Sequence, residues 1–120
     1  MNETQKIKEW IHELTEFCIK HRGRCFKDWS RERIFLYLFG SSLMGILHVL
    51  RDDNQNVDGV FIASPATEEN VVFAQIVGNR NSVGKAFQIS RKLFPNAKKW
   101  FTYRRGKFVE IHSIHRFCTQ

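Results

Sequence analysis

The chain has 120 residues, 42% of them hydrophobic, and a formal net charge of +7. This much apolar material, including 11 Phe and 3 Trp, predicts one domain over residues 1–120 and excludes wholesale disorder. No apolar run approaches the roughly 18 residues of a membrane span, and residues 1–20 are charged and amphipathic, unlike a signal peptide. We therefore expect a soluble, cytoplasmic protein that does not contact a membrane.

Two helices are predicted at the start of the chain. Residues 3–20 carry apolar side chains at the spacing of an amphipathic helix. A second helix is expected to begin at Ser30 and to be broken by the Gly-Ser-Ser sequence at residues 40–42. Because residues 34–39 are apolar nearly all round, this helix should be buried on more than one side.

Three strands and a third helix are predicted next. Residues 43–50 and 57–63 flank a turn rich in Asp and Asn and indicate a β-hairpin. The central strand, residues 71–77, is apolar and rich in β-branched side chains. A helix over residues 82–94 follows it and ends before Pro95, which disfavours α geometry in the preceding residue. Small or apolar side chains form its expected buried face: Val83, Ala86, Phe87, Ser90, Leu93 and Phe94.

Two last strands complete the prediction. Residues 98–104 and 107 to about 115 flank a tight turn at Arg105-Gly106. The expected order is therefore α-α-β-β-β-α-β-β. It predicts an α+β fold in which helices pack on a mixed sheet.

This order and one motif resemble the GNAT family of N-acetyltransferases. In that family two helices precede a three-strand meander, and its third strand leads through a turn and a helix to a parallel strand. The turn carries Gln or Arg, two residues, Gly, one residue, then Gly or Ala. Residues 81–86, Asn-Ser-Val-Gly-Lys-Ala, match from the fourth position on, with Asn81 at the first position and Arg80 one place out of register. The resemblance covers residues 3–104 and implies a single GNAT-like domain that transfers an acyl group from acetyl-CoA to an amine.

The resemblance also implies a cofactor site. The pantetheine would lie along residues 74–77, and the diphosphate would meet backbone N–H groups that have no intrahelical partner. Gly84 would let the diphosphate approach the backbone, while Arg80 and Lys85 would add positive charge. The implied cofactor-binding residues are Val77, Arg80, Asn81, Ser82, Val83, Gly84, Lys85 and Ala86. Alternatively, Gly84 and Ala86 are small because the helix packs closely on the sheet.

The catalytic residues are the point at which the chain departs from the family. Most members place another helix after the parallel strand, often with a tyrosine that protonates the leaving thiolate, whereas this chain continues into a hairpin. Tyr103 is the tyrosine available in that region, and Glu110 and His48 are candidate general bases. For His48, an ordinary half-buried histidine is the alternative. Three cysteines without C-x-x-C spacing (Cys18, Cys25 and Cys118) indicate idle thiols in a reducing compartment, and no Cys/His spacing predicts a metal site.

Positive charge gathers in the C-terminal part of the chain. Residues 79–120 hold ten Lys and Arg against Glu110 alone, which favours a polyanionic partner. Cations alternate with aromatics over residues 98–108, as on surfaces that bind single-stranded nucleic acid, although core aromatics flanked by solvated charges would give the same pattern. The candidate polyanion-binding residues are Lys98, Lys99, Arg104, Arg105 and Lys107. The second functional hypothesis is therefore a non-enzymatic GNAT-like binding or structural module, of the kind found in phages and mobile elements, whose partner is nucleic acid or an acidic protein.

Overall fold

The computed structural model describes residues 2–21, 25–78, 80–104 and 106–111. Its elements are α1 (Glu3–Lys20), α2 (Arg31–Leu43), β1 (Leu47–Arg51), β2 (Val57–Pro65), β3 (Asn70–Gly78), α3 (Arg80–Leu93), β4 (Lys99–Arg104) and β5 (Lys107–Glu110). The strands form one sheet in chain order, antiparallel except for the parallel β3–β4 pair. The predicted α+β class and mixed sheet are confirmed.

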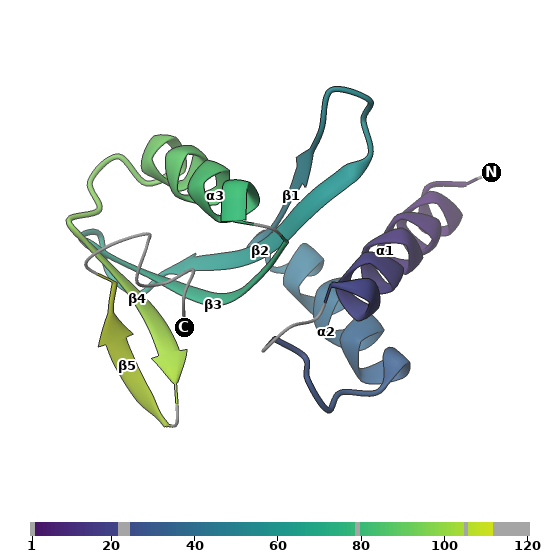
Figure 1. Ribbon diagram of the computed structural model, residues 1–120, viewed down its shortest axis with the longest axis horizontal. Helices are drawn as coiled ribbons and strands as arrows, with labels where there is room; N and C mark the ends of the chain where they lie inside the picture. The colour runs from purple at the N-terminus through teal and green to yellow at the C-terminus, as the bar shows by residue number, and fades with distance from the viewer. Residues whose placement is uncertain (1, 22–24, 79, 105, 112–120) are drawn as a thin grey trace.

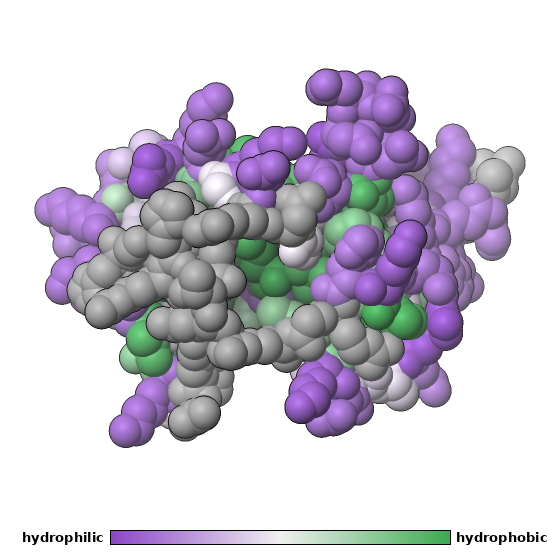
Figure 2. All heavy atoms as spheres, in the orientation of Figure 1, coloured by the Kyte–Doolittle hydropathy of each residue, from purple (hydrophilic) through white to green (hydrophobic). Residues whose placement is uncertain are grey.

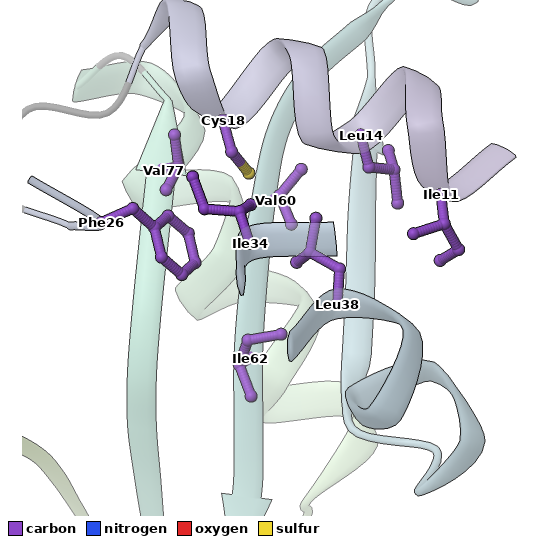
Figure 3. Packing of buried hydrophobic residues seen from close by; sticks show 9 residues of the cluster. All are labelled: Ile11, Leu14, Cys18, Phe26, Ile34, Leu38, Val60, Ile62 and Val77. Atoms are coloured by element: carbon purple, nitrogen blue, oxygen red, sulfur yellow. The ribbon is translucent and has the colours of Figure 1, made fainter. Parts of the chain in front are cut away.

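The helices lie on opposite faces of the sheet, with α1 and α2 on one side and α3 on the other (Figure 1). Figure 3 shows the core between the first pair and the strands, made of Ile11, Leu14, Cys18, Phe26, Ile34, Leu38, Val60, Ile62 and Val77. The core beneath α3 consists of Leu50, Phe61, Ala63, Val71, Phe73, Val83, Ala86 and Phe87. The sheet is thus covered on both faces.

Helix α1 has the predicted bounds. Asn2 caps it, since its Oδ1 accepts a hydrogen bond from the Gln5 backbone N–H at 2.8 Å. The apolar stripe reaches the core through Ile11, Leu14 and Cys18, all fully buried. Local sequence alone therefore accounts for this element.

Helix α2 ends later than predicted. The expected break at residues 40–42 and the strand beginning at residue 43 are wrong, because the helix continues to Leu43 and β1 begins at Leu47. Ser41 is buried and continues the stripe of Ile34 and Leu38, so packing holds the last turn in place. Gly45, with φ 73°, ends the helix instead.

Helix α2 is also less covered than predicted. Its residues Ile34, Leu38 and Ser41 are buried on one side, but Leu36 is 61% exposed. The expectation that residues 34–39 are buried on more than one side is wrong at Leu36, while Phe35, Tyr37 and Phe39 are half-buried against the core.

Strand β3 contains a β-bulge. Gln75 pairs with Ile62 but Phe73 pairs with Ala63, so Ala74 is an extra residue on β3. Before the bulge, Val71 and Phe73 pack under α3, whereas Val77 packs with α1 and α2. The bulge therefore reverses which face of the sheet the odd-numbered residues of β3 occupy.

Helix α3 is fixed to the end of β3 by its first turn. Ser82 is fully buried, and its Oγ donates a hydrogen bond to the Asp58 backbone oxygen at 2.6 Å. A Cβ at Gly59 or Gly78 would come within 3.0 or 2.9 Å of the Ser82 Cβ, so both glycines are needed for this close approach. The helix begins at Arg80 and, contrary to the predicted buried face, leaves Leu93 46% exposed in its last turn.

Candidate cofactor site

An opening separates the second half of β3 from β4. Parallel pairing joins Asn70–Phe73 to Lys99–Thr102 and stops there. Figure 1 shows the two strands diverging beyond this point. Among the residues that the structure describes, the β3 edge over residues 74–78 therefore pairs with β2 on one side and with no strand on the other.

The opening has a hydrophobic floor. Figure 2 shows a hollow lined by apolar residues where β3 passes between the β4–β5 hairpin and the α1–α2 pair. Ala74 is half-buried on the face of β3 that packs with α1 and α2, whereas Ile76 is half-buried on the α3 face. An extended ligand with amide groups would find backbone hydrogen-bonding groups and apolar surface here together.

Cys25 contacts one backbone carbonyl of β3. Its Sγ donates to the Ile76 backbone oxygen at 3.3 Å. Burial and the neighbouring Cys25 raise the pKa of the Tyr37 hydroxyl, so this phenol stays protonated near neutral pH. No local pattern indicates that Cys25 contacts β3 or that Tyr37 lies beside Cys25, because a loop and a helix distant in sequence bring them there.

Cys18 lies in the core beside this group. Burial, with a smaller contribution from Cys25, raises the pKa of the Cys18 thiol to about 12. The thiolate is the reactive form of cysteine, so Cys18 is an inert core residue at neutral pH. Cys118 lies outside the described residues.

The N-terminus of α3 follows directly from the open part of β3. Asn81, Gly84 and Lys85 are the residues of the predicted motif with exposed or half-exposed positions here. Lys85 Nζ lies 3.4 Å from Asp58 Oδ2, with the Lys85 side chain 51% exposed. The Arg80 backbone begins the helix, and its side chain is outside the described part of the structure.

Three other predicted cofactor-binding residues are core residues. Val77 and Val83 are 3% and 8% exposed, and Ala86 is fully buried. Ser82 is buried as well, and its hydroxyl is bonded to the Asp58 backbone oxygen, so none of these four side chains is exposed. They fix the first turns of α3 against the sheet.

The surroundings of Gly84 and Ala86 differ. Ala86 packs in the core under α3, as the packing alternative predicted. A Cβ at Gly84, however, would have no atom within 4 Å among the described residues. Close packing therefore explains Ala86 and leaves open space at Gly84.

The predicted catalytic pair lies on the β4–β5 hairpin. The Tyr103 backbone pairs with Phe108, and Glu110 pairs with Phe101, so the two are diagonal neighbours in the ladder. Tyr103 is the first residue of β4 after its pairing with β3 ends, and its side chain lies outside the description. Glu110 is half-buried on the strand beyond β4. In register, Glu110 is level with Phe101 and Val72, and Tyr103 follows the last paired residue of β4, Thr102.

His48 lies elsewhere. It is on β1, at the opposite edge of the sheet, and its ring stacks on Phe61 with centroids 4.9 Å apart. Its Nε2 is buried and has no hydrogen-bond partner among the described residues. Burial lowers the His48 pKa. This geometry is that of a half-buried structural histidine, remote from the opening.

The basic segment is used partly for structure. Trp100 packs against Phe73 and Phe87, at centroid distances of 5.7 and 6.1 Å. Lys98 Nζ lies 3.1 Å from Glu69 Oε1. Lys99 and Lys107 are exposed, Arg104 is described only by its backbone, and Arg105 lies outside the described residues.

Two further findings concern metal sites and membrane spans among the described residues. No three His, Cys, Asp or Glu side chains gather there into a possible metal site. None of the helices there is both long and apolar enough to span a bilayer.

Comparison with protein-family models, with curated proteins and with solved structures finds no match to this chain. Its residues and geometry therefore carry the functional inference.

Proposed function

We propose that this chain is a GNAT-like acyltransferase that binds acetyl-CoA in the opening between β3 and β4 and acts on an amine. One observation carries the proposal: the open edge of β3 leads directly into the N-terminus of α3. A single ligand with an amide-bearing arm and an anionic group would suit them, with the arm along the β3 edge and the anion at the start of α3.

The pantetheine arm fits the β3 edge. Its amides would hydrogen-bond to backbone groups of residues 74–78, as an added strand does, while its methylene groups cover the apolar floor. The bulge at Ala74 interrupts the ladder at the start of this edge. Bulges are frequent next to active sites because they redirect the groups of a strand.

The diphosphate fits the first turn of α3. Unpaired N–H groups and the positive end of the helix dipole favour an anion there. The empty space around Gly84 permits a bulky group to approach the backbone, and Lys85 supplies a cation. Lys85 would exchange or share its contact with Asp58 when an anion is bound.

The transfer step needs a base for the amine and a proton for the departing thiolate. Acetyl-CoA supplies the activated acyl group as a thioester. Tyr103 holds the position at which β4 leaves β3, which suits the proton donor. Glu110, diagonal to it on β5, is the proposed base.

The alternative of a nucleic-acid or acidic-protein module has weaker support. Trp100, one of the aromatics in the basic segment, is a partner of core residues rather than a free stacking surface. Lys98 is engaged with Glu69. The positive charge of this segment remains compatible with steering an anionic cofactor.

Thermal unfolding tests the cofactor claim. Acetyl-CoA at 100-fold its Kd should stabilise the fold by about 2.7 kcal/mol, which raises the Tm by several degrees. Gly84→Glu should abolish this rise, because the new carboxylate would occupy the space meant for a phosphate and repel it. The variant itself should fold, since the site is open and an acidic residue near a helix N-terminus is favourable.

Gln88→Glu is the matched control. It adds the same charge to an exposed position one turn further along α3 and should keep the shift. Absence of any shift at millimolar acetyl-CoA would reject the proposal. An equal shift in the Gly84→Glu protein would reject the site.

A further inference from the structure

One face of α2 exposes large apolar side chains. Leu36, Leu43 and Met44 are 61%, 73% and 74% exposed. Leu36 and Leu43 lie opposite the buried face of the helix, which consists of Ile34, Leu38 and Ser41, and Met44 is the C-cap residue that follows Leu43. Contiguous exposed apolar surface of this kind marks an interaction site more often than it occurs by chance.

The exposed face is also free of charge. No charged residue occurs over residues 34–44, although 26% of the chain is charged and its net charge is +7. A second copy of the chain brings the same charges to the contact, so an uncharged segment on a two-fold axis avoids like-charge repulsion there. Residues 34–44 supply such a surface.

The shape of this face is self-complementary. Leu36, Gly40 and Leu43 follow one another at i, i+4 and i+7 and so share one stripe of the helix. A Cβ at Gly40 would have no atom within 4 Å, which leaves a shallow gap between the two leucines. Across a two-fold axis at Gly40, Leu36 of one copy would meet Leu43 of the other, as an isologous interface requires.

The available area is that of a weak, reversible dimer. The exposed parts of Leu36, Leu43 and Met44 amount to on the order of 400 Å², about half of the roughly 800 Å² that each partner contributes to a standard interface. Half-buried neighbours on α2, Phe35 and Phe39, stack at 6.2 Å and widen the apolar surface.

We propose that α2 is the self-association surface of this chain, in a two-fold homodimer with antiparallel α2 helices crossing at Gly40. This surface is separate from the proposed acetyl-CoA site, because Leu36 lies on the side of α2 opposite Ile34 and Leu38, which pack toward the sheet. It assigns a partner to the apolar face that the described residues leave uncovered.

Sedimentation velocity over a range of micromolar concentrations tests this proposal. The wild-type chain should form a dimer, and Leu36→Glu combined with Leu43→Glu should sediment as a monomer with unchanged circular dichroism. Gly40→Leu should weaken the dimer at least tenfold, because it fills the gap at the crossing point without a clash inside the monomer. Phe108→Glu is the matched control: it places a charge on another exposed apolar residue, 65% exposed on β5, and should leave the dimer intact.

A wild-type chain that stays monomeric throughout the range would overturn the proposal. It would do so even if a different protein were found bound to α2. Dimers that persist in the double glutamate variant would overturn it as well. Dissociation by Phe108→Glu, with α2 variants unaffected, would assign the interface to β5 instead.

Discussion

The ring of His48 is half-buried against Phe61, and its Nε2 lacks a hydrogen-bond partner in the described structure. A neutral imidazole tolerates this position better than an imidazolium, because burial penalises the charged form. Its alternation on a strand predicted a half-buried side chain. The missing partner depends on the packing of β1 on β2, which the local sequence does not encode.

The lowered pKa of His48 predicts how stability depends on pH. The unfolded chain, with a histidine pKa near 6.5, binds more protons than the folded chain below that pH, so stability is full above about pH 6.5 and falls as the pH drops through the folded pKa. The Tm should therefore decrease between about pH 7.5 and pH 5. In His48→Phe, which keeps a ring against Phe61, the decrease should be smaller. An identical pH profile in the two proteins would contradict this assignment.

Gly84 and Ala86 illustrate what residue types alone can say about the site. The sequence suggested either a cofactor cradle or close packing for both. The structure separates them, since Ala86 is fully buried and Gly84 faces open space. The difference follows from the rotation of α3 about its axis on the sheet. The close approach of Ser82 to Gly59 and Gly78 sets this rotation.

At the scale of elements, local signals predicted α1, β3, α3 and the start of α2 closely and failed at the end of α2 and the start of β1. Periodicity and capping lie within a few residues of one another and can be read directly. The end of α2 is decided by burial of Ser41 against the core, and the bulge at Ala74 by pairing with β2. Both depend on residues distant in sequence, so no local pattern could have located them.

The junction of β3 and α3 gives a prediction for two glycines. Gly78→Ala should destabilise the fold by about 1–3 kcal/mol, because its φ is 151° and its Cβ would lie 2.9 Å from the Ser82 Cβ and 3.0 Å from the Asp58 oxygen. Gly84→Ala should instead stabilise it by about 0.5–1 kcal/mol, as alanine favours a helix and has room there. Urea unfolding measures both changes. Equal effects of the two substitutions would show that the close contact at Gly78 does not hold α3 in place.

At the scale of the whole molecule, the opening between β3 and β4 is the feature on which function depends. The order of elements predicted a sheet in which a helix joins two parallel strands. The length of their pairing, which stops after Phe73 and Thr102, could not be predicted, because it results from the twist of the sheet and the bulge together. The residues that approach the open edge from α2 and the preceding loop were likewise unpredictable.

Hydrogen exchange measured by mass spectrometry, with and without acetyl-CoA, tests the proposed site most directly. Bound cofactor should slow exchange in peptides covering residues 74–85, where the open strand edge and the first turn of α3 supply N–H groups. The β1–β2 turn, residues 52–56, should exchange as before. Unchanged exchange over residues 74–85 at saturating acetyl-CoA, or protection confined to the β4–β5 hairpin, would contradict the account.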